Sequence, residues 1–481
     1  LEENITTTTL APGALTGSGI SLTASANVFQ AGHVDSFWKI SHTRQAQEQT
    51  LSLTATGISG TVIGRGEVNL VTTGRWDGNL QLQAQSNKTG AWETIREYTS
   101  VDASLNVDIL IEEDELSEDT NLRVNYTNGT TPTPGSSPAT AHLIAASRLV
   151  GGVIKITAVT DGQNATGDVV SDFIDTTATT NWCEGAWSDV RGHPRAVASF
   201  DERSIYGGTE YERQTIWGSQ TGNYEDLETG TLDTDAFKHT FSGKQQNVIQ
   251  AITGHNRLIV FTSGGEKILS GTTVEDAITP TNVNASTPSS YGSAYLQAQI
   301  VNDVILFAQR NGRKVREYIE DDLSVSGKYK APDMTILSDD ITAGKIVQTA
   351  YSQQPDSIYW AVTGDGRLIG LSYERDEDVV AWHEHTTDGE IESVATIYGD
   401  DGDEVWISVK RTIDGNTRRY IEVIDPTVWT EMEDMHYVDS GVKYSNPILT
   451  SGALVAGEDY RVIDPTGMDL TAVGGSATPE I

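Results

Sequence analysis

Two histidines separated by one residue, His383 and His385, have the clearest metal-binding chemistry in the sequence. On a β-strand, residues i and i+2 point to the same face, so both imidazoles could offer nitrogen ligands to a zinc ion. Thr387, however, occupies the position at which a zinc-protease helix would carry its second histidine, and no third ligand is apparent. We therefore expect a polar strand face here, without a bound metal.

A second candidate is the acidic run from Asp400 to Glu404, whose carboxylates are the hard oxygen ligands that calcium prefers. The spacing does not match an EF-hand loop, so we expect a solvated loop between two strands. Pairs of carboxylates also catalyse glycoside hydrolysis. In a chain with 68 Asp and Glu residues, however, such pairs are too numerous for any one of them to indicate an active site.

The other catalytic templates are absent or incomplete. No Gly-x-Ser-x-Gly motif occurs, and the Gly-Lys pairs at 243, 327 and 344 are followed by Gln, Tyr and Ile, so none completes a P-loop. The stretch Gly364-Asp365-Gly366 lies between two strand patterns and predicts a turn, not a dinucleotide site. The sequence therefore predicts no catalytic, cofactor-binding or metal-binding residues, and no cofactor.

Aromatic residues could instead serve sugar binding. Trp360, Trp382 and Trp406 could stack on sugar rings, but each lies within a strand pattern and is expected to pack neighbouring sheets together. The turn from Ser86 to Trp92 faintly resembles the Asp-box turn of sialidases, although Lys88 stands where the aspartate should be. Neither feature predicts an active site.

Charge and composition exclude several classes of protein. The chain has 481 residues and a formal net charge of −36, which disfavours binding to nucleic acid phosphates and to anionic lipid. A single cysteine, Cys183, excludes an intrachain disulfide framework and fits assembly in a reducing cytosol. The sequence has no apolar run of about 18 residues, the length a membrane-spanning helix needs.

The elements that must position any site are β-strands. Five hairpins are predicted in the second half of the chain, each from two strand patterns joined by a glycine-containing turn that tolerates positive φ angles. Their turns recur at intervals of about 47 to 57 residues, a spacing typical of four-stranded propeller blades. The predicted strand pairs are 204–206 with 214–217, 258–262 with 266–269, 304–308 with 314–319, 358–362 with 368–373, and 405–409 with 419–423.

These patterns predict an all-β chain built on a β-propeller. We expect an N-terminal arm with the first propeller strands over 1–66, and an inserted small β-sandwich over 67–142. The propeller platform is expected over 143–426, with strands such as 152–159 or the N-terminal segment completing the ring. Residues 427–481 are expected to form a C-terminal β module that is incomplete at Ile481.

Several blocks of sequence, in conserved order along about 55% of the chain, resemble the tail nozzle family of short-tailed bacteriophages. This family comprises the tail tubular protein B-like and packaged-DNA stabilisation proteins. The blocks are 191–197, 216–219, 222–224, 263–266, 279–283, 291–293, 312–317, 373–375 and 380–383, and a further stretch at 455–474 resembles a small β module of phage structural proteins.

This resemblance implies a structural virion protein without enzymatic activity. It implies a homohexameric ring below the portal and adaptor proteins, a channel through which the genome leaves, and docking surfaces for fibres or spikes. Such a protein assembles in the bacterial cytoplasm, becomes part of the virion and does not insert into a membrane. An acidic channel wall would let DNA pass without gripping it. The alternative hypothesis is a β-propeller that binds or hydrolyses glycans.

Overall fold

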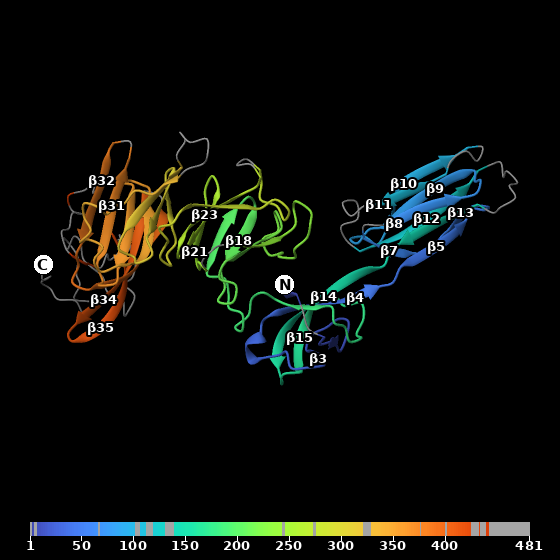
Figure 1. Cartoon of the computed structure of the whole chain (residues 1–481), viewed down its shortest axis with the longest axis horizontal. Helices are drawn as coiled ribbons and strands as arrows, with labels where there is room; N and C mark the ends of the chain where they lie inside the picture. The colour runs from blue at the N-terminus through green and yellow to red at the C-terminus, as the bar shows by residue number, and fades with distance from the viewer. Residues whose placement is uncertain are drawn as a thin grey trace, which may run out of the picture. The chain divides into compact units, whose positions relative to one another are not determined.

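The fold is described from a computed structural model of the chain (Figure 1). The described residues are 2–3, 7–65, 68–101, 106–111, 119–129, 139–242, 246–272, 276–320, 329–375, 377–399, 402–424, 432 and 439–441. Within them the fold is all-β, as predicted, and the one helical element is the short 3-10 segment η1 (Ala31–His33). No helix in this part of the chain is long and apolar enough to cross a membrane.

The chain divides into two compact units. Unit 1 comprises residues 1–298, 307–311 and 318–331, and unit 2 comprises 299–306, 312–317 and 332–481.

A seven-stranded antiparallel sheet opens unit 1. Its order is β1-β16-β4-β14-β15-β3-β2. The strands are β1 (Glu2–Glu3), β2 (Leu10–Pro12), β3 (Ile20–Ala24), β4 (Phe37–Arg44), β14 (Arg148–Val159), β15 (Asn164–Ser171) and β16 (Trp182–Glu184). Trp38 and Trp182 stack in its core with ring centroids 5.4 Å apart. Strand β14 pairs with β4 and β15, so the segment 152–159 belongs to this sheet and does not complete a propeller ring, contrary to expectation.

A two-sheet sandwich is inserted between β4 and β14. One sheet has the order β10-β9-β12-β6, with β7 also on β12, and the other has the order β11-β8-β13-β5. Its strands are β5 (Gln47–Ser52), β6 (Gly57–Ile58), β7 (Val62–Gly64), β8 (Val68–Thr73), β9 (Gly78–Gln85), β10 (Trp92–Ser100), β11 (Asp108–Ile111), β12 (Thr120–Asn128) and β13 (Thr140–Ala145).

The predicted start of this sandwich at residue 67 is wrong, because three earlier strands belong to it. Strand β5 pairs with β13 from Gln47↔Ala145 to Ser52↔Thr140, while β6 and β7 pair with β12. The strands expected to start the propeller within 1–66 therefore lie in the sandwich or in the seven-stranded sheet.

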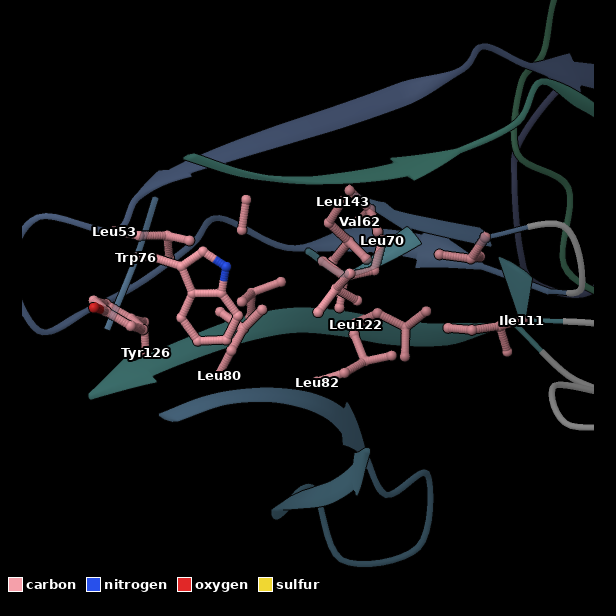
Figure 2. Packing of buried hydrophobic residues seen from close by; sticks show 14 of the residues in the cluster. Leu53, Val62, Leu70, Trp76, Leu80, Leu82, Ile111, Leu122, Tyr126 and Leu143 are labelled. Atoms are coloured by element: carbon pink, nitrogen blue, oxygen red, sulfur yellow. The ribbon is translucent and has the colours of Figure 1, made fainter. Parts of the chain in front are cut away.

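The sandwich has its own hydrophobic core (Figure 2). Leu70 and Leu143 from one sheet face Leu80, Leu82 and Leu122 from the other, and all five are fully buried. Alternating inward-facing residues of this kind are what a half-buried antiparallel sheet requires. The core explains why the module forms a compact body within the longer chain.

Five successive antiparallel sheets follow, each in simple up-and-down order. Four of them have four strands and the fifth has three. The first sheet contains β17 (Ala196–Phe200), β18 (Arg203–Gly207), β19 (Thr215–Gly218) and β20 (Phe237–Thr240), and the second contains β21 (Ile249–Gly254), β22 (Leu258–Thr262), β23 (Gly265–Ser270) and β24 (Asn284–Ser289). The third contains β25 (Gln299–Val301), β26 (Val304–Ala308), β27 (Val315–Glu320) and β28 (Tyr329–Lys330), and the fourth contains β29 (Ile346–Ser352), β30 (Ile358–Thr363), β31 (Leu368–Glu374) and β32 (Val379–His385). The fifth contains β33 (Glu390–Gly399), β34 (Gly402–Ile413) and β35 (Asn416–Val423).

These sheets have the strand order of propeller blades, and the five predicted hairpins are confirmed as the second and third strands of each sheet. Gly312, Gly366 and Gly415 have φ angles of 72°, 82° and 76° in the turns, a conformation that residues with a Cβ rarely adopt. The fold is therefore propeller-like, as expected. Nearly all of the C-terminal module predicted over 427–481 lies outside the described residues.

Candidate functional site

An ion pair between a buried carboxylate and a half-exposed arginine lies at the junction between the third and fourth sheets in unit 2. Glu317 lies on β27, on the same strand face as Val315 and Ile319, and its side chain is fully buried. Its Oε2 atom lies 2.8 Å from Nη1 of Arg375, the residue that follows β31. Tyr373 on β31 is also buried and lies beside the same carboxylate.

Burial raises the pKa values of both Glu317 and Tyr373. It raises the pKa of Glu317, and the positive charge of Arg375 opposes that rise only in part. Burial and the neighbouring Glu317 both raise the pKa of the Tyr373 hydroxyl. The side chains that could do acid-base chemistry are thus enclosed by protein. Glu317 and Tyr373 lie where two neighbouring sheets meet.

A second buried carboxylate, Glu266 on β23, connects neighbouring parts of the chain in unit 1. It is completely buried and accepts a hydrogen bond from the hydroxyl of Ser289 on β24. Backbone N–H groups of Tyr291 and Gly292 also donate to it, although burial still raises its pKa. This carboxylate connects strand β23 to the end of β24 and the residues that follow it. Its contacts are therefore structural.

The two histidines that were weighed as candidate metal ligands, His383 and His385, lie side by side on strand β32. Nδ1 of His383 lies 2.9 Å from Nε2 of His385, and both rings pack against Trp360. Burial lowers the pKa of both imidazoles. In the part of the chain that the structure describes, no group of three His, Cys, Asp or Glu side chains gathers around a common point. The contacts of the pair are therefore with Trp360 and with each other.

The acidic run is only partly described, since residues 400 and 401 lie outside the described ranges. Asp403 accepts a hydrogen bond from the backbone N–H of Gln353 (2.6 Å), and Glu404 accepts one from Nε1 of Trp406 (2.9 Å). The Asp403 contact joins the start of β34 to the chain just after β29, whereas the Glu404 contact lies within β34. Asp403 thus connects two adjacent sheets of unit 2.

The three tryptophans have different surroundings. Trp360 is buried and donates from Nε1 to the Ser352 hydroxyl, and Trp382 donates to the backbone oxygen of Met334. Both contribute to packing, as expected. Trp406 is half-buried on the outward face of the last sheet. The turn from 86 to 91 is an ordinary hairpin turn between β9 and β10 of the sandwich.

One surface pocket in unit 2 was not anticipated from the sequence. It holds about 210 Å³ of accessible space and is lined by Ile300, Asn302, Tyr351, Gln353, Tyr398 and Asp403. These residues come from β25 and the turn after it, the end of β29, the end of β33 and the start of β34. No sequence motif unites them, because only the stacking of three sheets brings them together.

Comparisons with known proteins leave the family open. No protein family model and no curated protein matches the chain. Among solved structures, one titled "NanB plus Optactamide" aligns over 86% of this chain and 89% of its own, with 8% sequence identity and a TM-score of 0.22. A likeness of this size does not bear on function.

Proposed function

We propose that this chain is a structural virion protein that forms the tail nozzle of a short-tailed phage. In this proposal six copies form a ring below the portal and adaptor proteins and enclose a channel for genome exit. The outer surfaces carry fibres or spikes. The protein has a structural role in this proposal and is not an enzyme.

The observation that carries the proposal is where the blocks of family resemblance lie in the fold. Block 312–317 meets block 373–375 through the buried pair of Glu317 and Arg375. Block 263–266 meets block 291–293, where Gly292 has a φ of +74° and a Cβ there would lie 2.5 Å from the Ser263 oxygen. The resemblance thus rests on residues that fasten sheets together, as expected for a shared scaffold.

A similar contact joins the first block to the chain after β24. The guanidinium of Arg195 lies over the ring of Tyr295, 4.3 Å from its centroid, and the Tyr295 hydroxyl donates to the Arg195 backbone oxygen. Both residues belong to unit 1. Each of these junctions uses charged or polar side chains for positioning, which supports a framework role over a catalytic one.

The charge of the chain supports conduction of DNA without binding. With a net charge of −36, the surface repels phosphates and cannot release counterions by neutralising them. We therefore expect no retardation of double-stranded DNA by the purified protein at 50 mM salt. Retardation that disappears as salt rises would reveal a basic channel and contradict this part of the proposal.

Mass photometry of the purified chain tests the assembly. Six copies of 51.9 kDa give a particle of about 311 kDa, and head-to-tail contacts form a ring when the rotation between neighbouring copies closes. A species of that mass would support the nozzle. A monomer that cleaves bacterial polysaccharide would contradict it and favour the alternative of a glycan-hydrolysing propeller.

A further inference from the structure

The surface pocket of unit 2 has a lining that suits a particular class of ligand. Its walls come from the third, fourth and fifth sheets, so its shape depends on the packing of strands and not on one loop. The pocket holds about 210 Å³ of accessible space, which is smaller than the range of about 300–1,000 Å³ typical of sites for drug-sized molecules. It can therefore hold a small ring or a short part of a longer ligand.

Two tyrosines provide aromatic surface. Tyr398, at the end of β33, is 90% exposed, an unusual degree for a large aromatic side chain. Tyr351 is partly buried, and its hydroxyl lies 3.0 Å from the Ser357 hydroxyl, which fixes the ring. An exposed ring beside a fixed one offers an apolar face that still tolerates water, and this suits a ligand whose C–H groups and hydroxyl groups alternate.

The polar groups of the pocket are oriented before any ligand arrives. Oδ2 of Asp403 accepts hydrogen bonds from the backbone N–H groups of Gln353 (2.6 Å) and Gln354 (3.3 Å). These bonds hold the carboxylate in place, and its second oxygen can accept from a hydroxyl. The amides of Asn302 and Gln353 each carry both a donor and an acceptor, as recognition of hydroxyl groups requires.

The same lining disfavours other ligands. It contains no Lys or Arg and it does contain a carboxylate, so phosphates, nucleotides and acidic sugars would be repelled. Five of its six residues have polar atoms, which argues against a lipid or another wholly apolar molecule. One carboxylate provides too few charged ligands for a calcium site, which usually takes 6–8 oxygens.

We propose that this pocket binds an uncharged glycan, with a sugar ring stacked on Tyr398 and its hydroxyls bound by Asp403, Gln353 and Asn302. The inference does not depend on the proposed tail role, since it stands on the lining of the pocket alone. It assigns sugar binding and no sugar cleavage.

The test uses the full chain and an array of neutral, sialylated and phosphorylated oligosaccharides, followed by calorimetric titration of the strongest neutral ligand. We expect binding to at least one neutral oligosaccharide. Tyr398→Ala should weaken it about tenfold or more, as expected for loss of a stacking contact worth about 1.4 kcal/mol. Tyr398→Phe should keep most of the affinity, because the ring remains.

Tyr224→Ala is the matched control, since Tyr224 is also exposed but does not belong to the pocket lining. It should leave the affinity unchanged. An array without any neutral ligand, a preference for acidic sugars, or equal binding by wild type and Tyr398→Ala would each overturn the proposal. Because Tyr398 is almost fully exposed, its replacement should not change the melting temperature, so lost binding cannot be ascribed to unfolding.

Discussion

The fourth and fifth sheets share one hydrophobic core but differ in how many faces they bury. Strand β30, in the fourth sheet, is buried at every position from Tyr359 to Thr363. Strand β34, in the fifth, alternates between buried and half-exposed positions from Val405 to Lys410. The fifth sheet thus packs one face on its neighbour, while its other face carries exposed apolar residues such as Ile421. Equivalent substitutions should therefore have unequal costs in the two sheets.

The largest contrast should come from two tryptophans. Trp360→Ala removes a fully packed ring and its hydrogen bond to Ser352, so the free energy of unfolding should fall by about 3–5 kcal/mol. Trp406→Ala, on the half-exposed face, should cost about 1 kcal/mol. Urea denaturation followed by circular dichroism measures both values. Equal losses would show that the two faces are equally buried.

Substitution of two isoleucines of the fifth sheet should show different stability losses on its two faces. Ile407 on β34 belongs to the shared core, so Ile407→Ala should lower the free energy of unfolding by about 2–4 kcal/mol. Ile421 on β35 is 71% exposed, and Ile421→Ala should change it by less than about 0.5 kcal/mol. Denaturation in urea again provides the readout. A large loss for Ile421→Ala would mean that this face is covered in solution.

Ion pairs with a buried and with an exposed carboxylate should also contribute unequally to stability. Glu317→Ala leaves Arg375 without its buried partner, and we expect a loss of about 2 kcal/mol because the half-exposed arginine can still be hydrated. Glu392→Ala breaks the exposed pair with Arg419 in the fifth sheet, and no measurable loss is expected. Thermal unfolding of the two variants compares them. A stability loss for Glu392→Ala as large as that for Glu317→Ala would refute the distinction.

The smallest effect is a pH dependence. The folded-state pKa of Glu317 lies above its ordinary value of 4.5, so the folded chain binds this proton more tightly than the unfolded chain does. The stability due to the protonated group is complete below pH 4.5 and falls as pH rises through the raised pKa. Relative to Glu317→Gln, the wild type should therefore lose free energy of unfolding as the pH rises above 4.5. A difference that does not change with pH would contradict the assigned direction.

Local patterns in the sequence predict the hairpins well, because each hairpin depends on neighbours in the chain. Strand-forming residues flank Asn311-Gly312, Asp365-Gly366 and Asp414-Gly415, and the glycines allow the positive φ angles of the turns. Strand β27 also carries a sequence signal for its ion pair. Val315, Glu317 and Ile319 share a strand face, so a carboxylate on an apolar face was visible before the structure.

Distant pairing could not be predicted in the same way. The alternation of β5 indicates a half-buried strand but not its partner, which is β13, about 90 residues later. The boundary of the sandwich was misplaced for this reason. The pocket likewise depends on Asn302, Tyr351 and Asp403, which only the stacking of separate sheets brings together.

Electron microscopy of the purified full-length chain tests the central claim most directly. The proposed nozzle predicts closed rings with sixfold symmetry, formed by this protein without any glycan or DNA present. Two-dimensional averages that show only single copies at micromolar concentration, or assemblies without sixfold symmetry, would contradict it.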